Sequence, residues 1–223
     1  MRDLQPSEML DQVRYSGIEA DAKISNIVLM GIGEPLENFD NVMKFLKLVN
    51  DETGLGIGMR HISLSTCGPE GGIDRLAQLD LQLTLSVSLH APDDETRSRI
   101  MPVNRKTGVK PLIDSCKRYY ERTGRRISFE YLMADGINDS DLMAERLAAL
   151  LRGMGAHVNL IPLNHVDGSD FQPSSRDRVL KFTEILEKNG VNATVRRRMG
   201  ADIDAACGQL RRRRAAGKED DQK

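Results

Sequence analysis

The sequence predicts an α/β protein built from repeated strand–helix units around a parallel sheet, and two observations support this prediction. Short β-branched or apolar runs alternate with longer segments of helical period. Each run also ends in a polar, glycine-containing or proline-containing stretch, as strands do where they pass into loops. With 223 residues, 39% of them hydrophobic, the chain is long enough to bury one substantial core.

Six apolar runs are predicted to form the sheet. Five are clear and the last is weaker: residues 26–33, 61–66, 83–90, 127–133, 157–163 and 192–198. No internal repeat beyond this strand–helix alternation is visible. One domain is therefore expected over residues 1–210, followed by a charged tail at residues 211–223 that we expect to be disordered.

Apolar residues at helical spacing predict the helices between these strands. The segment after Phe39 has one apolar face, formed by Val42, Phe45, Leu46 and Val49. The same pattern recurs over residues 143–151 behind a Ser140 cap, and over residues 179–186 before a stop at Gly190. Residues 6–13 also predict a helix, but no strand precedes it. The chain is therefore expected to begin in the middle of a strand–helix unit.

Composition narrows the class of protein. The formal net charge of −1 gives no overall attraction to nucleic acid or to membranes, so any basic surface must be local. No apolar run reaches the roughly 18 residues of a membrane span, and the N-terminus has no apolar signal region. Three cysteines are too few and too far apart for a secreted disulfide scaffold. We expect a cytoplasmic, monomeric protein with free thiols.

In parallel α/β folds the functional residues lie at the carboxyl ends of the strands, which directs attention to the stretch GEPL at residues 33–36. Gly33 allows close approach of a ligand to the backbone, and Glu34 can accept hydrogen bonds from a ligand ammonium group. The alternative for Glu34 is a helix-capping or solvent-exposed carboxylate. A bare Gly-Glu-Pro tripeptide favours that alternative.

Other polar residues also follow predicted strands. Ser65 and Ser88 offer hydroxyl groups to a ribose or a carboxylate, or they satisfy backbone groups in turns. His90, without a second metal-ligand candidate nearby, is typical of a hydrogen-bonded scaffold residue rather than of an acid or a metal ligand. Asn164 offers both a donor and an acceptor, or serves the turn chemistry of its loop.

Cys207 differs from the other two cysteines because its segment, ADIDAACGQL, has small and acidic residues and little hydrophobic periodicity. The arginines at 196–198 and 211–214 favour a thiolate, whereas the neighbouring aspartates oppose it. These arginines also suggest a local RNA contact, with a solvated charged face as the commoner alternative. Cys116 is predicted to pack in the core, and Cys67 to be a bystander near the site.

Five segments together resemble the RlmN family of radical S-adenosylmethionine (SAM) enzymes, which methylate adenosine in RNA. They are MGIGEPLENFDNV, GLGIGMRHISLSTCG, SVSLHAPDDETRSRIMPVNRK, HVNLIPLNHVDGSD and ADIDAACGQL, and the resemblance extends from about Leu4 to Leu210. It implies a partial TIM-type (β/α) barrel of the radical SAM type, lacking the first strand and the cluster loop.

The resemblance also implies roles for individual residues. Gly33, Glu34, Ser65, the segment Ser88-Leu89-His90 and Asn164 would bind SAM, with Glu34 accepting from its ammonium group. Cys207 would be the methyl-carrying cysteine. Methyl transfer from one SAM to this cysteine, followed by radical chemistry from a second SAM at a [4Fe-4S] cluster, would give 2-methyladenosine in 23S rRNA and tRNA. A flavodoxin-like protein would supply electrons.

The sequence departs from this family in one respect. The CxxxCxxC motif that holds the cluster is absent, since Cys67, Cys116 and Cys207 lie far apart, so we expect neither a cluster nor methyl transfer by this chain alone. Three alternatives remain open: a non-catalytic remnant that binds RNA or SAM, methylation at C8 as in the relative Cfr, and a barrel enzyme acting on a small phosphorylated substrate.

Overall fold

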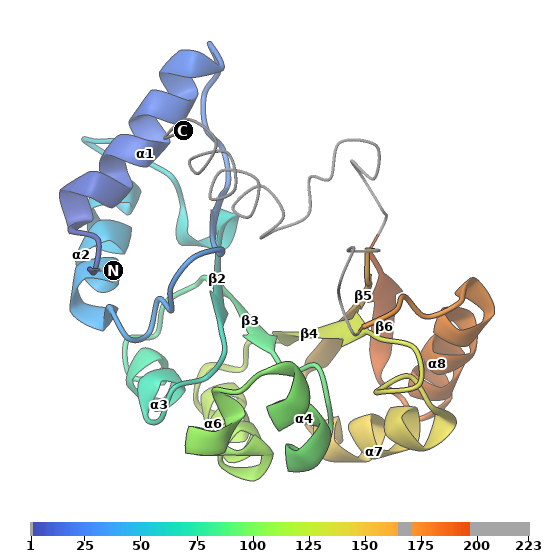
Figure 1. Ribbon diagram of the computed structural model, residues 1–223. Coiled ribbons are helices and arrows are strands. Elements are labelled where there is room, and N and C mark those ends of the chain that lie inside the picture. The colour runs from blue at the N-terminus through green and yellow to red at the C-terminus, as the bar shows by residue number, and fades with distance from the viewer. Residues whose placement is uncertain (1, 165–170, 197–223) are drawn as a thin grey trace, which may run out of the picture.

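A computed structural model describes residues 2–164 and 171–196, which form a six-stranded parallel sheet in the order β1-β2-β3-β4-β5-β6. Strand order in the sheet follows chain order. After each strand the chain crosses the outer side of the sheet, and the next strand pairs beside the previous one. This is the arrangement of a partial TIM-type barrel, and it confirms the predicted fold class. Figure 1 shows the strands as an arc with helices along its outer side.

The six strands occupy the six predicted runs. Their bounds are β1 (Ile27–Leu29), β2 (Ile62–Thr66), β3 (Thr84–Ser88), β4 (Ile127–Met133), β5 (Ala156–Pro162) and β6 (Asn192–Val195). β1 is shorter than its apolar run because Gly31 and Gly33, at φ 119° and 98°, take the backbone out of the extended region. β3 ends before His90, whose φ is 60°.

The helices also agree with the predicted positions, and the helix around Cys116 and three short helices are added. Their bounds are α1 (Pro6–Glu19), α2 (Phe39–Asn50), α3 (Gly72–Ala77), α4 (Asp94–Ile100), α5 (Asn104–Thr107), α6 (Val109–Thr123), α7 (Asp141–Leu151) and α8 (Arg176–Lys188), with a 3-10 turn η1 (Met59–His61). The predicted Ser140 cap is present, since its side chain accepts a hydrogen bond from the Met143 amide. In the described part of the chain, no helix is long and apolar enough to cross a membrane.

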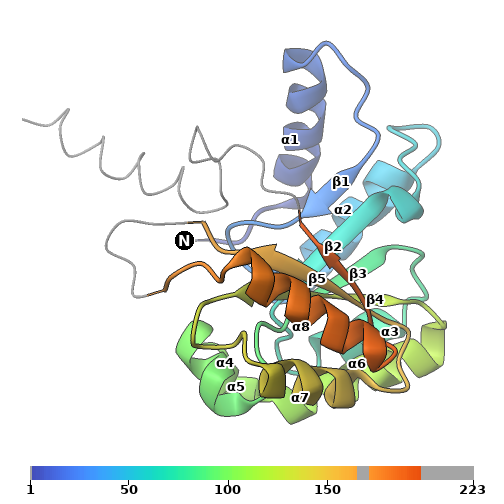
Figure 2. The same ribbon diagram turned by 90° about the vertical axis from the view of Figure 1, so that its right-hand side faces the viewer.

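The core lies between the outer face of the sheet and the helices. Alternate strand residues pack there with exposures of 9% or less, as in Leu64, Leu85, Phe129 and Val158. Helix α8 covers the outer side of β5 and β6 (Figure 2), and Phe182 on this helix contacts the ring of Tyr131 on β4. Cys116 is fully buried in this core, which confirms the packing role predicted for it.

The opposite face, which we call the inner face, is mostly polar. Its polar residues are Ser63 and Ser65 on β2, Thr84, Ser86 and Ser88 on β3, Ser128 and Glu130 on β4, and His157 and Asn159 on β5; Val28, Leu132 and Ile161 are apolar residues on the same face. The interior of a closed TIM barrel is usually filled with large branched apolar side chains. Small hydroxyl and amide groups leave room and hydrogen-bonding capacity for a ligand instead.

Candidate functional site: the carboxyl ends of the strands

Glu34 connects the exits of the first two strands. Its Oε1 accepts hydrogen bonds from the Leu36 amide at 3.0 Å and from the Thr66 hydroxyl at 2.7 Å, and its Oε2 accepts from the Cys67 amide at 2.8 Å. Glu34 therefore joins the turn before α2 to the end of β2, and it does not cap α2, whose N-cap residue is Asn38. These three donors leave lone pairs of the carboxylate available, because a carboxylate can accept about four hydrogen bonds.

Cys67 lies directly beside this carboxylate. Burial raises the pKa of its thiol to about 12; the Glu34 carboxylate acts in the same direction, and the Arg97 guanidinium opposes it. At neutral pH the side chain is a protonated, weakly nucleophilic thiol. The bystander role of its sulfur stays a prediction, and its amide is one of the groups that orient Glu34.

Ser65 and Ser88 both lie on the inner face at the carboxyl ends of neighbouring strands. Ser65 is the residue before the last of β2, and Ser88 is the last residue of β3. Their half-buried side chains alternate with Leu64 and Val87, which are fully buried on the outer face. This placement brings two of the predicted hydroxyl groups to one edge of the sheet.

Leu89 contributes through its backbone. Its side chain is fully buried in the core, its amide donates to the Glu130 carbonyl at 3.1 Å, and its carbonyl accepts from the Ala91 amide and from Arg97. The side chain and backbone groups of Leu89 are therefore occupied by protein contacts and offer little to a ligand. These contacts hold the backbone in place between Ser88 and His90.

His90 is held as a neutral donor. Its Nδ1 accepts a hydrogen bond from the Leu132 amide at 3.0 Å, so in the neutral ring the proton is on Nε2. Burial and, to a smaller extent, the Arg97 cation together lower the pKa of His90 to about 4. Asn138 donates to the His90 carbonyl at 2.8 Å. These bonds agree with the scaffold role predicted for His90 and leave its Nε2–H able to donate.

Asn164 lies two residues beyond β5, at the same edge of the sheet, with a half-buried side chain. The candidate methyl-carrying residue, Cys207, lies outside the described residues. Gly33, in the loop after β1, has open space where a Cβ would be placed, which is consistent with close approach of a ligand.

Arg97 is a component of this site that the sequence did not reveal. Its side chain is fully buried, and its guanidinium donates to the carbonyls of Leu89 at 3.0 Å, Cys67 at 2.9 Å and Ser88 at 2.9 Å, and to the Asn104 side chain at 2.6 Å. Arg97 therefore links the end of β3 and the loops that follow β2 and β3 by hydrogen bonds to their carbonyl groups. A charged residue on a short polar helix gives no sequence signal for such burial.

Comparison with known proteins identifies the class. The Radical SAM superfamily profile matches residues 1–149, and the chain belongs to this superfamily. A solved radical SAM methyltransferase from Sphaerobacter thermophilus superposes with a TM-score of 0.87 at 46% identity, covering 94% of this chain and 62% of that one. A domain of a pyruvate-formate lyase-activating enzyme from Bacteroides vulgatus, at 17% identity and a TM-score of 0.62, shares the fold.

Curated relatives are more similar in sequence. Proteins named "Probable dual-specificity RNA methyltransferase RlmN" from Clostridium tetani and Desulforamulus reducens are 51% and 52% identical over 96% of this chain. The predicted resemblance to RlmN proteins is thereby confirmed. The chain spans 61% of the length of each of these two relatives.

Superfamily membership implies that the complete enzyme binds SAM and a [4Fe-4S] cluster. The described residues show which of the two they could bind. The polar groups at the ends of β1, β2, β3 and β5 suit a ligand with ammonium, carboxylate and hydroxyl groups. Among residues 2–164 and 171–196, no group of three His, Cys, Asp or Glu side chains is arranged to hold a metal ion. The residues fit SAM, and the described region contributes no cluster ligand set.

Proposed function

We propose that this chain is the SAM-binding barrel of a radical SAM methyltransferase that forms 2-methyladenosine in 23S rRNA and tRNA. The observation that carries the proposal is the identity of about half of all residues with proteins named as RNA methyltransferases, over 96% of the chain. Glu34, Ser65, Ser88 and His90 around one sheet edge support it.

In this proposal Glu34 accepts from the ammonium group of SAM through lone pairs that its protein donors leave available. The Nε2–H of His90, Ser65, Ser88 and Asn164 supply further polar contacts, and Gly33 lets the ligand approach the backbone. SAM supplies a transferable methyl group and, together with a reduced [4Fe-4S] cluster, radical chemistry.

Cys207 carries the methyl group in the proposed reaction. Its thiol loses a proton, its sulfur forms a bond to the methyl carbon as the sulfonium–methyl bond of SAM breaks, and S-adenosylhomocysteine leaves. The methyl thioether is then the one-carbon donor to adenine. The arginines near Cys207 supply positive charge for phosphate groups of the RNA.

A second candidate is binding of SAM or RNA without turnover. It is favoured by the cysteines, because Cys67, Cys116 and Cys207 do not form the CxxxCxxC spacing of a cluster site. For the same reason we expect no methyl transfer to RNA by this chain alone.

Two measurements test these proposals. Calorimetric titration with SAM is expected to show binding by the wild type and at least tenfold weaker binding by Glu34→Gln, which removes the anionic acceptor. Unchanged affinity would remove Glu34 from the site. Glu145→Gln on the outer surface of α7 is the matched control.

The second measurement concerns the reaction. The purified chain is incubated with iron, sulfide, a reductant, SAM and RNA, and the digested RNA is analysed by mass spectrometry against 2-methyladenosine and 8-methyladenosine standards. 2-Methyladenosine that disappears in Cys207→Ala would support the enzyme and refute the expected inactivity of this chain alone. 8-Methyladenosine would refute the proposed position, and SAM binding without either product would agree with the expected inactivity of this chain alone, an outcome that both candidates share.

A further inference from the structure

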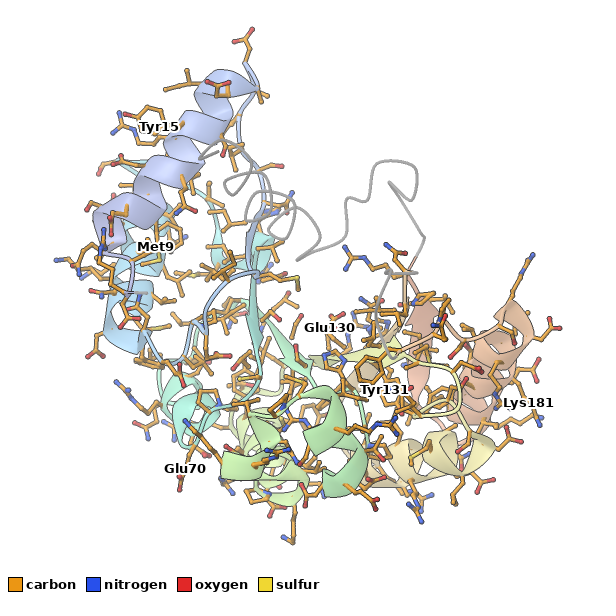
Figure 3. The ribbon with its side chains drawn as sticks, viewed as in Figure 1. Met9, Tyr15, Glu70, Glu130, Tyr131 and Lys181 are labelled. Carbon is orange, nitrogen blue, oxygen red and sulfur yellow. The ribbon has the colours of Figure 1, made fainter. Side chains whose placement is uncertain are left out.

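Thr66 places a hydroxyl group at a core position of the sheet. The register pairs Thr66 with Val87 and Val87 with Phe129, and both of these partners are fully buried on the helix side. Figure 3 shows the two sides of the sheet on β4, where Tyr131 points toward the helices and Glu130 toward the open side of the arc. Thr66 itself is 1% exposed. A buried hydroxyl is costly unless it is hydrogen-bonded, so the partners of Thr66 should account for its presence.

Both hydrogen-bonding directions of this hydroxyl are fixed. The Gly68 amide donates to Thr66 Oγ1 at 2.9 Å, and an amide N–H can only donate. The one proton of the hydroxyl is therefore available for Glu34 Oε1, which lies 2.7 Å from Thr66 Oγ1. The bond from Gly68 holds Oγ1 in place, so the hydroxyl donates to the carboxylate in one orientation.

The loop that supplies the Gly68 amide is held against the core. At Gly68, whose φ is 77°, an added Cβ would lie 2.2 Å from Leu112 Cδ1, so the backbone passes close to a buried side chain. Arg97 donates to the carbonyl of Cys67 at 2.9 Å. The Thr66 hydroxyl therefore connects the Glu34 carboxylate to a loop that other contacts already fix.

Thr66 differs in kind from the other two donors described for Glu34. Those donors are the backbone amides of Leu36 and Cys67, which any residue at these positions would supply. The Thr66 hydroxyl is the side-chain donor of the three, so a substitution can remove it without changing the backbone. The orientation of Glu34 therefore depends on residue type at position 66.

We propose that Thr66 is a positioning residue for ammonium recognition, because its hydroxyl holds the Glu34 carboxylate in the orientation that receives a ligand ammonium group. This inference rests on the proposed function, in which the ligand is SAM. A carboxylate that is oriented before binding loses less side-chain freedom when the ligand arrives. Loss of the hydroxyl should therefore weaken the contact between Glu34 and the ammonium group.

The alternative is a purely structural role, in which Thr66 only closes the turn at Gly68. Such a role would change the stability of the fold and would affect all ligands of the site alike. A positioning role acts through Glu34 and therefore affects only ligands that carry an amino group. Thr66→Val removes the hydroxyl with little change of shape, whereas Thr66→Ser retains it.

The test is calorimetric titration of the full chain with S-adenosylhomocysteine and with its desamino analogue, which lacks only the amino group. Thr66→Val is expected to weaken S-adenosylhomocysteine binding about fivefold, the effect of one hydrogen bond, and to leave binding of the analogue within about twofold of the wild type. Thr66→Ser should bind both ligands like the wild type. Equal weakening of both ligands by Thr66→Val, or no weakening of either, would overturn the inference.

Thr183→Val is the matched control, because it removes a threonine hydroxyl that donates to the Val179 carbonyl within α8, on the outer layer of helices. It should bind both ligands like the wild type. Urea denaturation measures the stability of each variant separately from its affinity. If Thr66→Val does not fold, Thr66→Ala gives the same comparison between the two ligands.

A double variant distinguishes failure of this inference from failure of the proposed function. Thr66→Val should cause no further loss of S-adenosylhomocysteine binding in a Glu34→Gln background, since Thr66 acts through Glu34. A further loss would overturn the positioning role. If Glu34→Gln weakens binding and Thr66→Val does not, the proposed SAM site stands and the positioning role is wrong. If Glu34→Gln has no effect, or the wild type does not bind at millimolar concentration, the proposed role of Glu34 fails and the positioning role fails with it.

Discussion

Acidification should destabilise the fold through His90, well above the pH at which most carboxylates titrate. The imidazole is buried beside the Arg97 cation, and both burial and that charge lower its pKa, to about 4. Its Nδ1 accepts from the Leu132 amide, so a proton on Nδ1 would also break a backbone hydrogen bond. Protonation of His90 therefore costs the folded state this hydrogen bond.

The size of the effect follows from proton linkage. An unfolded histidine has a pKa of about 6.5, so between pH 6.5 and the folded value of about 4 the unfolded chain binds more protons than the folded one. Stability therefore falls as the pH drops through this window. The expected loss is about 2 kcal/mol at pH 5 and about 3 kcal/mol at pH 4, relative to pH 7.

Urea denaturation at pH 7 and pH 5 measures this loss, with His90→Asn as the comparison. The asparagine Oδ1 can accept from the Leu132 amide, and asparagine tolerates the φ of 60° at this position. The wild type is expected to lose about 2 kcal/mol more than His90→Asn between the two pH values. His157, whose pKa is also lowered by burial, is present in both proteins and cancels in this difference.

Parallel pH dependence in the two proteins would refute this reasoning, because it would mean that His90 titrates alike in the folded and unfolded chains. His61→Asn is the control, since His61 is exposed on the turn before β2. This variant should retain the wild-type loss between pH 7 and pH 5.

Two further predictions concern the loop after β2 and the thiols. Gly68→Ala should lower the free energy of unfolding by about 2 kcal/mol more than Gly71→Ala in urea titrations. Both residues have positive φ, but only a Cβ at Gly68 would overlap a buried side chain, Leu112 Cδ1, at 2.2 Å. Cys67 and Cys116, whose thiol pKa values are raised by burial to about 12, should react with iodoacetamide at pH 8 roughly 1,000-fold more slowly than in urea. Rapid labelling of Cys67 or Cys116 in the native protein, detected by mass spectrometry of its peptides, would contradict this prediction.

The sheet could be predicted from the sequence because each strand is a local run of apolar residues. Every predicted run overlaps a strand, and where β1 and β3 stop short, the cause is backbone conformation. Gly31 and Gly33 take up positive φ after β1, and the amides of Leu89 and His90 both turn to one carbonyl of β4. Such endings depend on contacts between strands that a single run does not encode.

The candidate site was partly predictable for a related reason. Parallel strands bring their carboxyl ends to one edge, so a polar residue after each run is expected near the others. Thr66 and Arg97 were missed because their roles come from partners about thirty residues away in the chain.

The contacts of Glu34 explain why a structural role and a role as ligand acceptor are compatible. The Leu36 amide, the Thr66 hydroxyl and the Cys67 amide fix the carboxylate before any ligand arrives. Arg97 in turn fixes the carbonyl of Cys67. A ligand ammonium would then meet an anion whose orientation is already set, and binding would not have to order that side chain. The hydrogen bonds that make Glu34 a structural residue are therefore those that would make it an effective acceptor.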